Sequence, residues 1–307
     1  MKKLFALFVS CFMSAAFAQP FPAKPITVIV PFGPGGTTDL MARVLQVEFE
    51  KAIGGPMIIT NKAGAGGAIA MAEVARANPD GYTIAMTTIG PQVLQPTLKK
   101  LSYQTDSFDY ICGTYDVPLM LMVTPDSPFK TLADVIIFAK QNPGKLNYGS
   151  SGQGTALHIS MAALLKKAGV DGLHVPYKSS GEMATGLLGK HVMMFAETPA
   201  VATQYQLRPL AVFSEKRLDT HPAVATILEA GFDVQGIVWG GLVAPKGLPA
   251  DTRSKLAAAC AKATASDNYK AGSVRLNSPL VYRDATAFAA FAANEAKAYS
   301  AAVREYC

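Results

Sequence analysis

Three glycine-rich stretches hold most of the side chains that could bind a ligand. They are "PFGPGGTTD" at 31–39, "NKAGAGGA" at 61–68 and "GSSGQGT" at 149–155. In each case a strand-like apolar run comes before the glycines and a helical pattern follows them. Such a turn leaves backbone N–H groups pointing outward at a helix N-terminus, where they favour an anion. The hydroxyls of Thr37, Thr38, Ser150, Ser151 and Thr155 would add donors.

A single loop of this kind is more often only a helix cap in a tight turn. Two loops that carry hydroxyl groups, one in each half of the chain, favour a shared anion site instead. Glu197 follows an apolar strand in "MMFAETPA" and has two interpretations, a helix cap or surface charge on one hand and a ligand-facing group on the other. Asp39 lies in the first turn of a helix, where the helix dipole alone could account for it.

The sequence lacks the nucleotide-binding, hydrolase and metal-binding motifs that its glycine loops and histidines could have formed. "GPGGTTD" lacks the lysine of a phosphate-binding P-loop, and "GAGGAI" has Ile69 where a dinucleotide fingerprint needs its last glycine. Gln153 replaces the glycine of a hydrolase elbow, and the four histidines show no metal-ligand spacing. We therefore expect no enzyme, no cofactor and no metal. A nucleotide- or NAD-using enzyme is the alternative, and a thermal shift with NAD or ATP would detect it.

Alternating strands and helices must position these loops. The pattern predicts an α/β architecture with a largely parallel sheet. The alternation restarts after Pro125, which suggests two lobes: 19–123 plus 236–307 as lobe 1, and 124–235 as lobe 2. Expected strands are 26–30, 57–60, 82–87, 108–113, 119–123, 146–149, 173–176, 192–195, 210–213 and 237–243; expected helices include 38–52, 132–141, 155–167, 181–188, 250–265 and 286–306.

The N-terminus and the composition indicate an exported protein. Residues 1–18 combine two lysines, an apolar run and a final Ala-Phe-Ala, which is the pattern of a signal peptide. The whole chain carries a net charge of +6, and removing the two lysines leaves 28 − 2 − 22 = +4, spread along the chain. Scattered charge of this size does not indicate nucleic-acid binding. The mature chain keeps Cys112, Cys260 and Cys307, so one disulfide can form, with three possible pairings.

Five motifs occur in the order expected of one protein family. They are "KPITVIVPFGPGGTTDLMARVL", "NKAGAGGAIAMAEVARANPDGYT", "GSSGQGTALHISMAAL", "VPYKSSGE" and "WGGLVAPKGLP". Over the whole mature chain the sequence resembles the substrate-binding proteins of tripartite tricarboxylate transporters, the Bug or TctC family. The resemblance implies a periplasmic-binding-protein type II fold of two lobes, each a mixed sheet flanked by helices.

The same resemblance implies which residues contact the ligand. The first loop would hold one carboxylate from lobe 1, and the third loop would oppose it from lobe 2. Tyr177 and Lys178 stand in the V-P-Y-K segment, although Ser179 replaces the usual glycine after that lysine. The full set implied is Phe32, Gly33, Gly36, Thr38, Asp39, Thr87, Thr88, Ser150, Ser151, Gly152, Thr155, Tyr177, Lys178 and Glu197.

The function implied is that of a monomeric receptor in the periplasm. It would bind a small organic carboxylate, either a di- or tricarboxylate or an aromatic carboxylate, and deliver it to the membrane permease subunits of the transporter. The alternative is a carboxylate-sensing receptor that docks a signalling partner instead of a permease. Whether permease genes lie beside the gene for this chain would distinguish the two.

Overall fold

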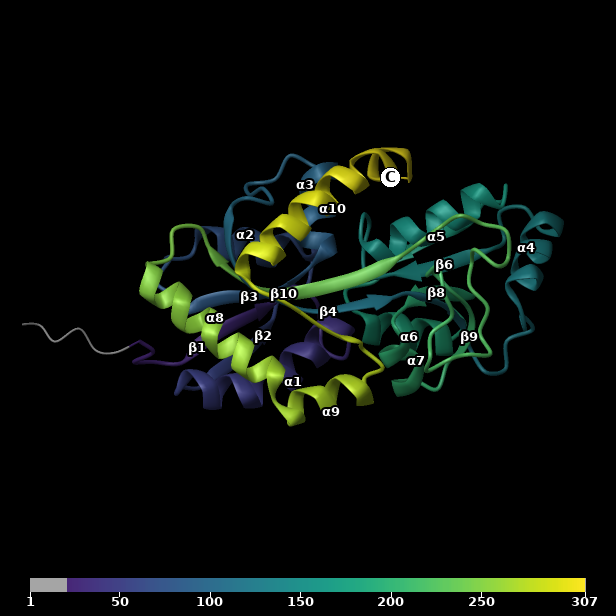
Figure 1. Cartoon of the computed structure of the whole chain (residues 1–307). Helices are drawn as coiled ribbons and strands as arrows, with labels where there is room; N and C mark the ends of the chain where they lie inside the picture. Colours follow the sequence, from purple (N-terminus) through teal and green to yellow (C-terminus); the bar gives the residue numbers. More distant parts are fainter. Residues whose placement is uncertain (1–20, 307) are drawn as a thin grey trace, which may run out of the picture.

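The computed structural model describes residues 21–306 and contains two separate sheets (Figure 1). The expected signal peptide and Cys307 lie outside the described residues. The first sheet has the strand order β11-β4-β10-β3-β1-β2. Its strands are β1 (Ile26–Val30), β2 (Met57–Asn61), β3 (Thr83–Thr88), β4 (Phe108–Pro118), β10 (Ile237–Pro245) and β11 (Leu280–Arg283).

The second sheet has the order β7-β6-β8-β5-β9. Its strands are β5 (Met120–Val123), β6 (Asn147–Ser150), β7 (Leu173–Pro176), β8 (Met194–Glu197) and β9 (Arg208–Val212). In both sheets the strands that precede the glycine loops, β1 and β6, have parallel neighbours, whereas β10 and β5 run antiparallel to theirs. The expectation that each sheet is mixed is confirmed. The expectation of a largely parallel sheet is wrong, because β10 and β5 run opposite to the strands beside them.

The chain crosses between the sheets at two adjacent points. Leu119 donates its N–H to the Gly236 carbonyl at 2.9 Å, and the N–H of Phe213 is bonded to the Leu119 carbonyl at 2.8 Å. Because β5 already belongs to the second sheet, the first crossing falls after Pro118 and not after residue 123. The division of the chain into two lobes remains our proposal, with the first boundary moved from residue 123 to Pro118. Lobe 1 contains the first sheet and lobe 2 the second.

Helices cover both sheets, and three of them begin directly after the glycine loops. Lobe 1 carries α1 (Thr37–Ile53), α2 (Ala68–Arg76), α3 (Gln95–Leu98), α8 (Ala250–Ala265), α9 (Asp267–Arg275) and α10 (Ala285–Tyr306), with short turns η1 (Ala65–Gly67) and η2 (Gly90–Leu94). Lobe 2 carries α4 (Leu132–Gln141), α5 (Ala156–Lys167), α6 (Ser180–Leu188) and α7 (Pro199–Gln204). Helix α10 extends from lobe 1 to contact α5 (Figure 1). In the described part of the chain, no helix has the length and hydropathy needed to cross a bilayer.

Helix α1 shows how the sequence fixes the position of a loop. Met41, Leu45 and Phe49 recur every four residues and are fully buried, so one face of the helix packs into the core of lobe 1. The helix ends at Gly54, whose left-handed φ of 77° suits glycine. Its buried face therefore holds the helix N-terminus, and the loop before it, at the edge of the sheet.

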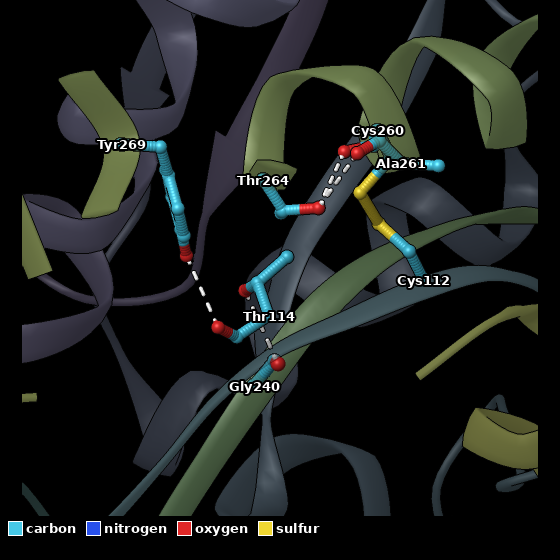
Figure 2. The surroundings of a disulfide bond; sticks show 7 residues. All are labelled: Cys112, Thr114, Gly240, Cys260, Ala261, Thr264 and Tyr269. Atoms are coloured by element: carbon cyan, nitrogen blue, oxygen red, sulfur yellow. Dashed lines mark hydrogen bonds between the residues drawn. A yellow bond between two sulfur atoms is a disulfide. The ribbon is translucent and has the colours of Figure 1, made fainter. Parts of the chain in front are cut away.

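A disulfide between Cys112 and Cys260 ties β4 to α8 inside lobe 1 (Figure 2). Both cysteines are fully buried, and they lie 148 positions apart in the sequence. This is one of the three pairings that the sequence left open. A crosslink over so long a loop removes conformational freedom from the unfolded chain and is worth about 2–5 kcal/mol.

Candidate ligand-binding site

One small cavity lies between the loops that begin α1 and α5. Its volume is about 30 Å³, which is room for two or three waters. Its walls combine hydroxyl, carboxyl and apolar side chains, and no Lys, Arg or His contributes to them. The lining residues are Phe32, Gly36, Thr37, Thr38, Asp39, Thr88, Ile89, Gly90, Ser151, Thr155, Ala156, Leu157, Ser180, Glu197 and Val238.

Asp39 organises the lobe 1 side of the cavity. Its carboxylate accepts hydrogen bonds from the Gly35 N–H at 3.0 Å and the Asn61 amide at 2.9 Å, and it pairs with Arg43 at 3.0 Å. Burial raises the pKa of Asp39, but the hydrogen bonds from Arg43, Asn61 and Gly35 outweigh burial and bring the pKa below its usual range. Asp39 is therefore ionised, and its charge is already compensated within lobe 1.

The first turn of α1 presents unused backbone donors to the cavity. The helix has no side-chain cap, and its first internal bond runs from the Leu40 N–H to the Gly36 carbonyl. The N–H groups of Thr37, Thr38 and Asp39 precede that bond, so they have no partner within the helix. The positive end of the helix dipole adds to their attraction for an anion.

The Thr38 hydroxyl is oriented by a buried tyrosine. The Tyr115 hydroxyl is 3.1 Å from the Thr38 hydroxyl and can donate to it, which leaves the Thr38 proton free to point into the cavity. Thr88 donates its own hydroxyl proton to the Trp239 carbonyl at 2.5 Å. Burial raises the pKa of Tyr115, so its phenol stays neutral and remains a donor.

On the lobe 2 side, neutral groups organise the loop before α5. The Ser150 hydroxyl is 2.6 Å from His174 Nε2, and Thr155 caps the helix while donating to the Gly152 carbonyl at 2.8 Å. His158 Nδ1 accepts the Gly154 N–H at 3.2 Å, and its ring lies 4.0 Å from that of His174.

Both histidines are held neutral. Burial, and to a smaller extent the nearby His174, lower the pKa of His158 to about 4. Burial likewise lowers the pKa of His174 to about 4. The loop before α5 is therefore maintained by uncharged imidazoles, which cannot attract an anion by charge.

The donors that lobe 2 offers to the cavity are a hydroxyl and two backbone groups. The Ser151 side chain lines the cavity and has no hydrogen-bond partner among the described residues. The first bonds of α5 are made by the N–H groups of His158 and Ile159, so those of Ala156 and Leu157 are left without intrahelical partners. An anion in the cavity would thus meet two helix N-termini, one from each lobe.

Glu197, at the end of β8, is the second acidic residue of the cavity and is only 3% exposed. The Ser180 hydroxyl and the Thr198 N–H donate to its two oxygens, the latter at 2.8 Å. Burial raises the pKa of Glu197, although hydrogen bonds from Ser180, Thr198 and Thr37 oppose this effect. Unlike Asp39, it has no cationic partner among the described residues.

The lobes touch on both sides of the cavity, so the structure is closed. Gln95 of lobe 1 donates to the Gln153 carbonyl of lobe 2 at 2.6 Å, and the hydroxyls of Thr37 and Thr198 are hydrogen-bonded. Gly152, with φ of +125°, lies so close to lobe 1 that an added Cβ would be 3.2 Å from Gly66 Cα. This contact requires glycine for both conformation and space.

The structure brings together most, but not all, of the residues expected at the site. Those that line the cavity are Phe32, Gly36, Thr38, Asp39, Thr88, Ser151, Thr155 and Glu197. Those that do not are Gly33, Thr87, Ser150, Gly152, Tyr177 and Lys178.

Each residue outside the lining has a local reason for its position. Thr87 alternates with Thr88 along β3, so its hydroxyl points to Gln92 at 3.1 Å. Ser150 is engaged by His174, and Lys178 is exposed with its N–H bonded to Glu182. Gly33 and Gly152 pack against the opposite lobe, while Tyr177 packs over Gly149 and Gly186. Contact of these six residues with a ligand stays a prediction.

Several lining residues were not predicted as ligand contacts from the sequence. Thr37 was considered only as a hydroxyl donor of the first loop, and Ser180 was visible as the second serine of "KSSGE". Leu157 and Val238 carried no signal, because an apolar side chain in a helix or strand looks the same whether it faces a core or a cavity. In the part of the chain described, no group of three His, Cys, Asp or Glu residues could hold a metal.

Comparisons with a family model and with individual relatives identify the same protein family. Residues 41–306 match the model of the tripartite tricarboxylate transporter family receptor, TctC. A UPF0065 protein encoded in the gbd 5' region of Cupriavidus necator is 37% identical over 304 residues, covering 98% of this chain and 93% of its own. The chain therefore belongs to the TctC receptor family, whose members are solute-binding receptors and not enzymes.

Solved structures support the same conclusion. The periplasmic binding protein BugD superposes with a TM-score of 0.88 at 29% identity, covering 93% of this chain and 98% of its own. MatC from Rhodopseudomonas palustris with bound malate has a TM-score of 0.87 at 28% identity, covering 92% of this chain and 100% of its own. Rpa4515 from R. palustris with adipate also has 0.87 at 28% identity, with coverages of 92% and 97%. The two-lobed α/β fold is thus that of periplasmic binding proteins.

Proposed function

We propose that this chain is a monomeric receptor whose two lobes close on one small organic carboxylate. The observation that supports this most strongly is the convergence of α1 and α5, whose first turns line the same cavity from opposite lobes. Thr38 and Ser151 add one hydroxyl donor from each side. Relatives that hold malate and adipate make a carboxylate the ligand class to expect.

Hydrogen bonds suffice for this binding without a cationic side chain. A hydrogen bond to a charged group contributes about 1.5–3 kcal/mol, and a helix N-terminus adds about 0.3–2 kcal/mol. Three or four such contacts reach the roughly 8 kcal/mol of a micromolar Kd, before the costs of association are subtracted. Closure removes water and strengthens each contact.

We further propose that the receptor acts in the periplasm and delivers its ligand to a tripartite tricarboxylate transporter permease. The signal-peptide pattern of residues 1–18 and the periplasmic neighbours support the location. Uptake of the bound carboxylate into vesicles that contain the permease should require added receptor. Uptake that proceeds equally well without the receptor would favour a sensing role.

Calorimetric titration of the mature protein tests carboxylate binding. The panel contains aliphatic di- and tricarboxylates, hydroxy acids, amino acids and aromatic carboxylates. We expect micromolar or tighter binding of at least one small acid, and failure of all of them would contradict the proposal. Thr38→Ala and Ser151→Ala should each weaken that binding about tenfold without loss of folding, since each removes one donor to a charged group. Ser254→Ala, on the exposed face of α8, is the matched control and should bind as the unmodified protein does.

A further inference from the structure

One of the three glycine-rich stretches, "NKAGAGGA" at 61–68, contributes no residue to the cavity. Its turn η1 packs instead against the lobe 2 loop that precedes α5. A Cβ added to Gly152 would be 3.2 Å from Gly66 Cα, and a Cβ added to Gly66 would be 3.2 Å from the Gln153 carbonyl oxygen. This stretch therefore touches the loop before α5 without lining the cavity itself.

Gln95, the first residue of α3, is a side chain that crosses from lobe 1 to the same loop. It is fully buried, and its amide donates to the Gln153 carbonyl at 2.6 Å. Its second polar atom, Oε1, has no hydrogen-bond partner among the described residues. A buried amide with one hydrogen bond adds little to the stability of the lobe that contains it, because its unpaired oxygen has been taken out of water. The position of Gln95 therefore points to a role in the contact between the lobes.

The segment that carries Gln95 is anchored inside lobe 1 by a second glutamine. Gln92 is also fully buried, and its amide donates to the Tyr110 hydroxyl at 2.8 Å and to the Thr105 carbonyl at 3.1 Å. Its oxygen accepts the Thr87 hydroxyl at 3.1 Å. All these partners belong to lobe 1, so Gln92 can hold turn η2 whether the lobes are open or closed. Gln95 differs because its hydrogen-bond partner belongs to the other lobe.

Glycines on both sides make room for the Gln95 amide. A Cβ added to Gly66 of lobe 1 would overlap that amide. A Cβ added to Gly154 of lobe 2 would lie 3.0 Å from the Gln95 Nε2 and would overlap Leu98. Both glycines have left-handed φ angles, +62° and +73°. The amide can therefore reach a backbone carbonyl of the opposite lobe because neither glycine carries a side chain.

We propose that Gln95 and the glycine stretch at 61–68 form a latch that keeps the receptor closed on its ligand. Gln95 acts as a positioning residue, which holds the loop before α5 against lobe 1 and does not touch the ligand. The latch rests on the function proposed above. Opening separates Gln95 from Gln153, and closure restores their hydrogen bond together with the packing of Gly66 on Gly152. A hydrogen bond of this kind favours the closed form by about 3- to 10-fold, and it does so equally for every ligand.

Gln95→Glu tests the latch, because it keeps the shape of the side chain and replaces the donor by a carboxylate oxygen. The probes are malate, adipate and any other acid of the panel above that the unmodified protein binds. By calorimetry we expect the variant to bind each acid about 10- to 100-fold more weakly, by one common factor, because closure buries a charge that faces a carbonyl. Small-angle scattering at saturating acid should show a more open molecule. Gln104→Glu, at an exposed position of lobe 1, should bind and close as the unmodified protein does.

Stability without ligand separates a latch from a side chain that only packs lobe 1. Ligand-free Gln95→Glu should unfold at the same urea concentration as the unmodified protein, since opening leaves residue 95 in water. Full affinity of Gln95→Glu overturns the latch. A loss that differs between acids also overturns it, because Gln95 would then contact the ligand. In both cases carboxylate binding by the unmodified protein leaves the receptor function intact, whereas no binding of any acid rejects both proposals.

Gly154→Ala and Gly144→Ala decide the question if Gln95→Glu is destabilised without ligand. Both glycines belong to lobe 2 and have nearly the same left-handed φ, +73° and +72°, so alanine is strained to the same degree at each. A Cβ at 154 meets Gln95 and Leu98 of lobe 1, whereas a Cβ at 144 has open space around it. We expect Gly154→Ala to weaken binding about 3- to 10-fold and Gly144→Ala to leave it unchanged. Equal affinities of these two variants overturn the latch.

Discussion

In lobe 1 the loop before α1 is held by a charged group, and in lobe 2 the loop before α5 is held by neutral ones. Asp39 keeps its negative charge and gathers Gly35, Arg43 and Asn61 around it. The lobe 2 loop depends instead on His158 and His174, which remain uncharged within the folded protein. The two loops present similar backbone donors to the same cavity, although their supports differ in chemistry.

This difference gives the two loops different responses to acid. The pKa of Asp39 is lowered on folding, so its contribution to stability is present above its unfolded pKa of 3.8 and is lost only as pH falls further. The pKa of each histidine falls from 6.5 to about 4, so the unfolded chain takes up protons first as pH decreases. Lobe 2 therefore loses stability between about pH 6.5 and 4, whereas the support of the lobe 1 loop persists over this range.

The largest expected effect comes from the crosslink that lobe 1 has and that the described part of lobe 2 lacks. Replacing both Cys112 and Cys260 by alanine should lower the free energy of unfolding by about 2–5 kcal/mol. Urea denaturation followed by the fluorescence of Trp239, the single tryptophan, reports on lobe 1. The unmodified protein with reductant should match the variant, and ligand affinity should not change. An unaltered unfolding midpoint would contradict the stabilising role of the disulfide.

Removing the charge of Asp39 should have the next largest effect. Asp39→Asn leaves Arg43 and the Gly35 N–H with weaker acceptors, so we expect unfolding to require about 2 kcal/mol less. Asp267→Asn is the matched control, because Asp267 is also in the first turn of a helix but is fully exposed. If the two variants were equally stable, Asp39 would not organise its loop.

The change in unfolding free energy with pH that comes from the lobe 2 loop should be similar to, or smaller than, the effect of Asp39→Asn. Protonation of His158 on unfolding should cost the fold on the order of 2–3 kcal/mol between pH 6.5 and 4, and His174 less because its ring is partly exposed and therefore screened. In His158→Asn the amide oxygen can replace Nδ1 as acceptor for Gly154, so stability should vary less over this range. His191→Asn, at an exposed position, should keep the original profile. If stability varied with pH in His158→Asn as it does in the unmodified protein, groups other than His158 would cause the acid sensitivity.

The smallest effect concerns the contact between the two loops. An alanine at Gly36 fits its φ of −91° but would place a Cβ 2.8 Å from the Ser180 hydroxyl oxygen in the closed form. Gly36→Ala should therefore weaken ligand binding about tenfold, or roughly 1.4 kcal/mol, while the open protein folds normally. Calorimetry gives the affinity, and small-angle scattering of the ligand-saturated variant should show a more open molecule. Full affinity and full closure would mean that Ser180 moves aside without cost.

Much of the fold could be predicted because apolar periodicity encodes it locally. Strand 26–30 and helices 132–141 and 250–265 were predicted to the residue, since each has an uninterrupted pattern and a clear end. The sequence did not indicate α9 or β11, because α9 is polar on most of its surface and β11 is short and half-exposed. The crossing near residue 119 was placed too late, because a buried strand reads the same in either sheet.

The sequence indicated residues of the candidate cavity where their side-chain chemistry carried the signal. Thr38, Ser151 and Glu197 line this cavity, and their contact with a ligand stays a prediction. Thr87 and Thr88 could not be distinguished from the sequence, because their positions on β3 depend on which face of the strand turns to the cavity. Ser150 was predicted to contact the ligand, but His174, which engages its hydroxyl, comes from a neighbouring strand.

A crystal structure of the mature protein with a bound small carboxylate tests the two-helix site most directly. We expect one carboxylate group about 2.7–3.2 Å from N–H groups in the first turns of both α1 and α5, with the Thr38 and Ser151 hydroxyls alongside. A ligand bound through only one lobe would contradict this arrangement. So would a carboxylate held by Lys216, Arg217 and Lys270, which line a separate groove.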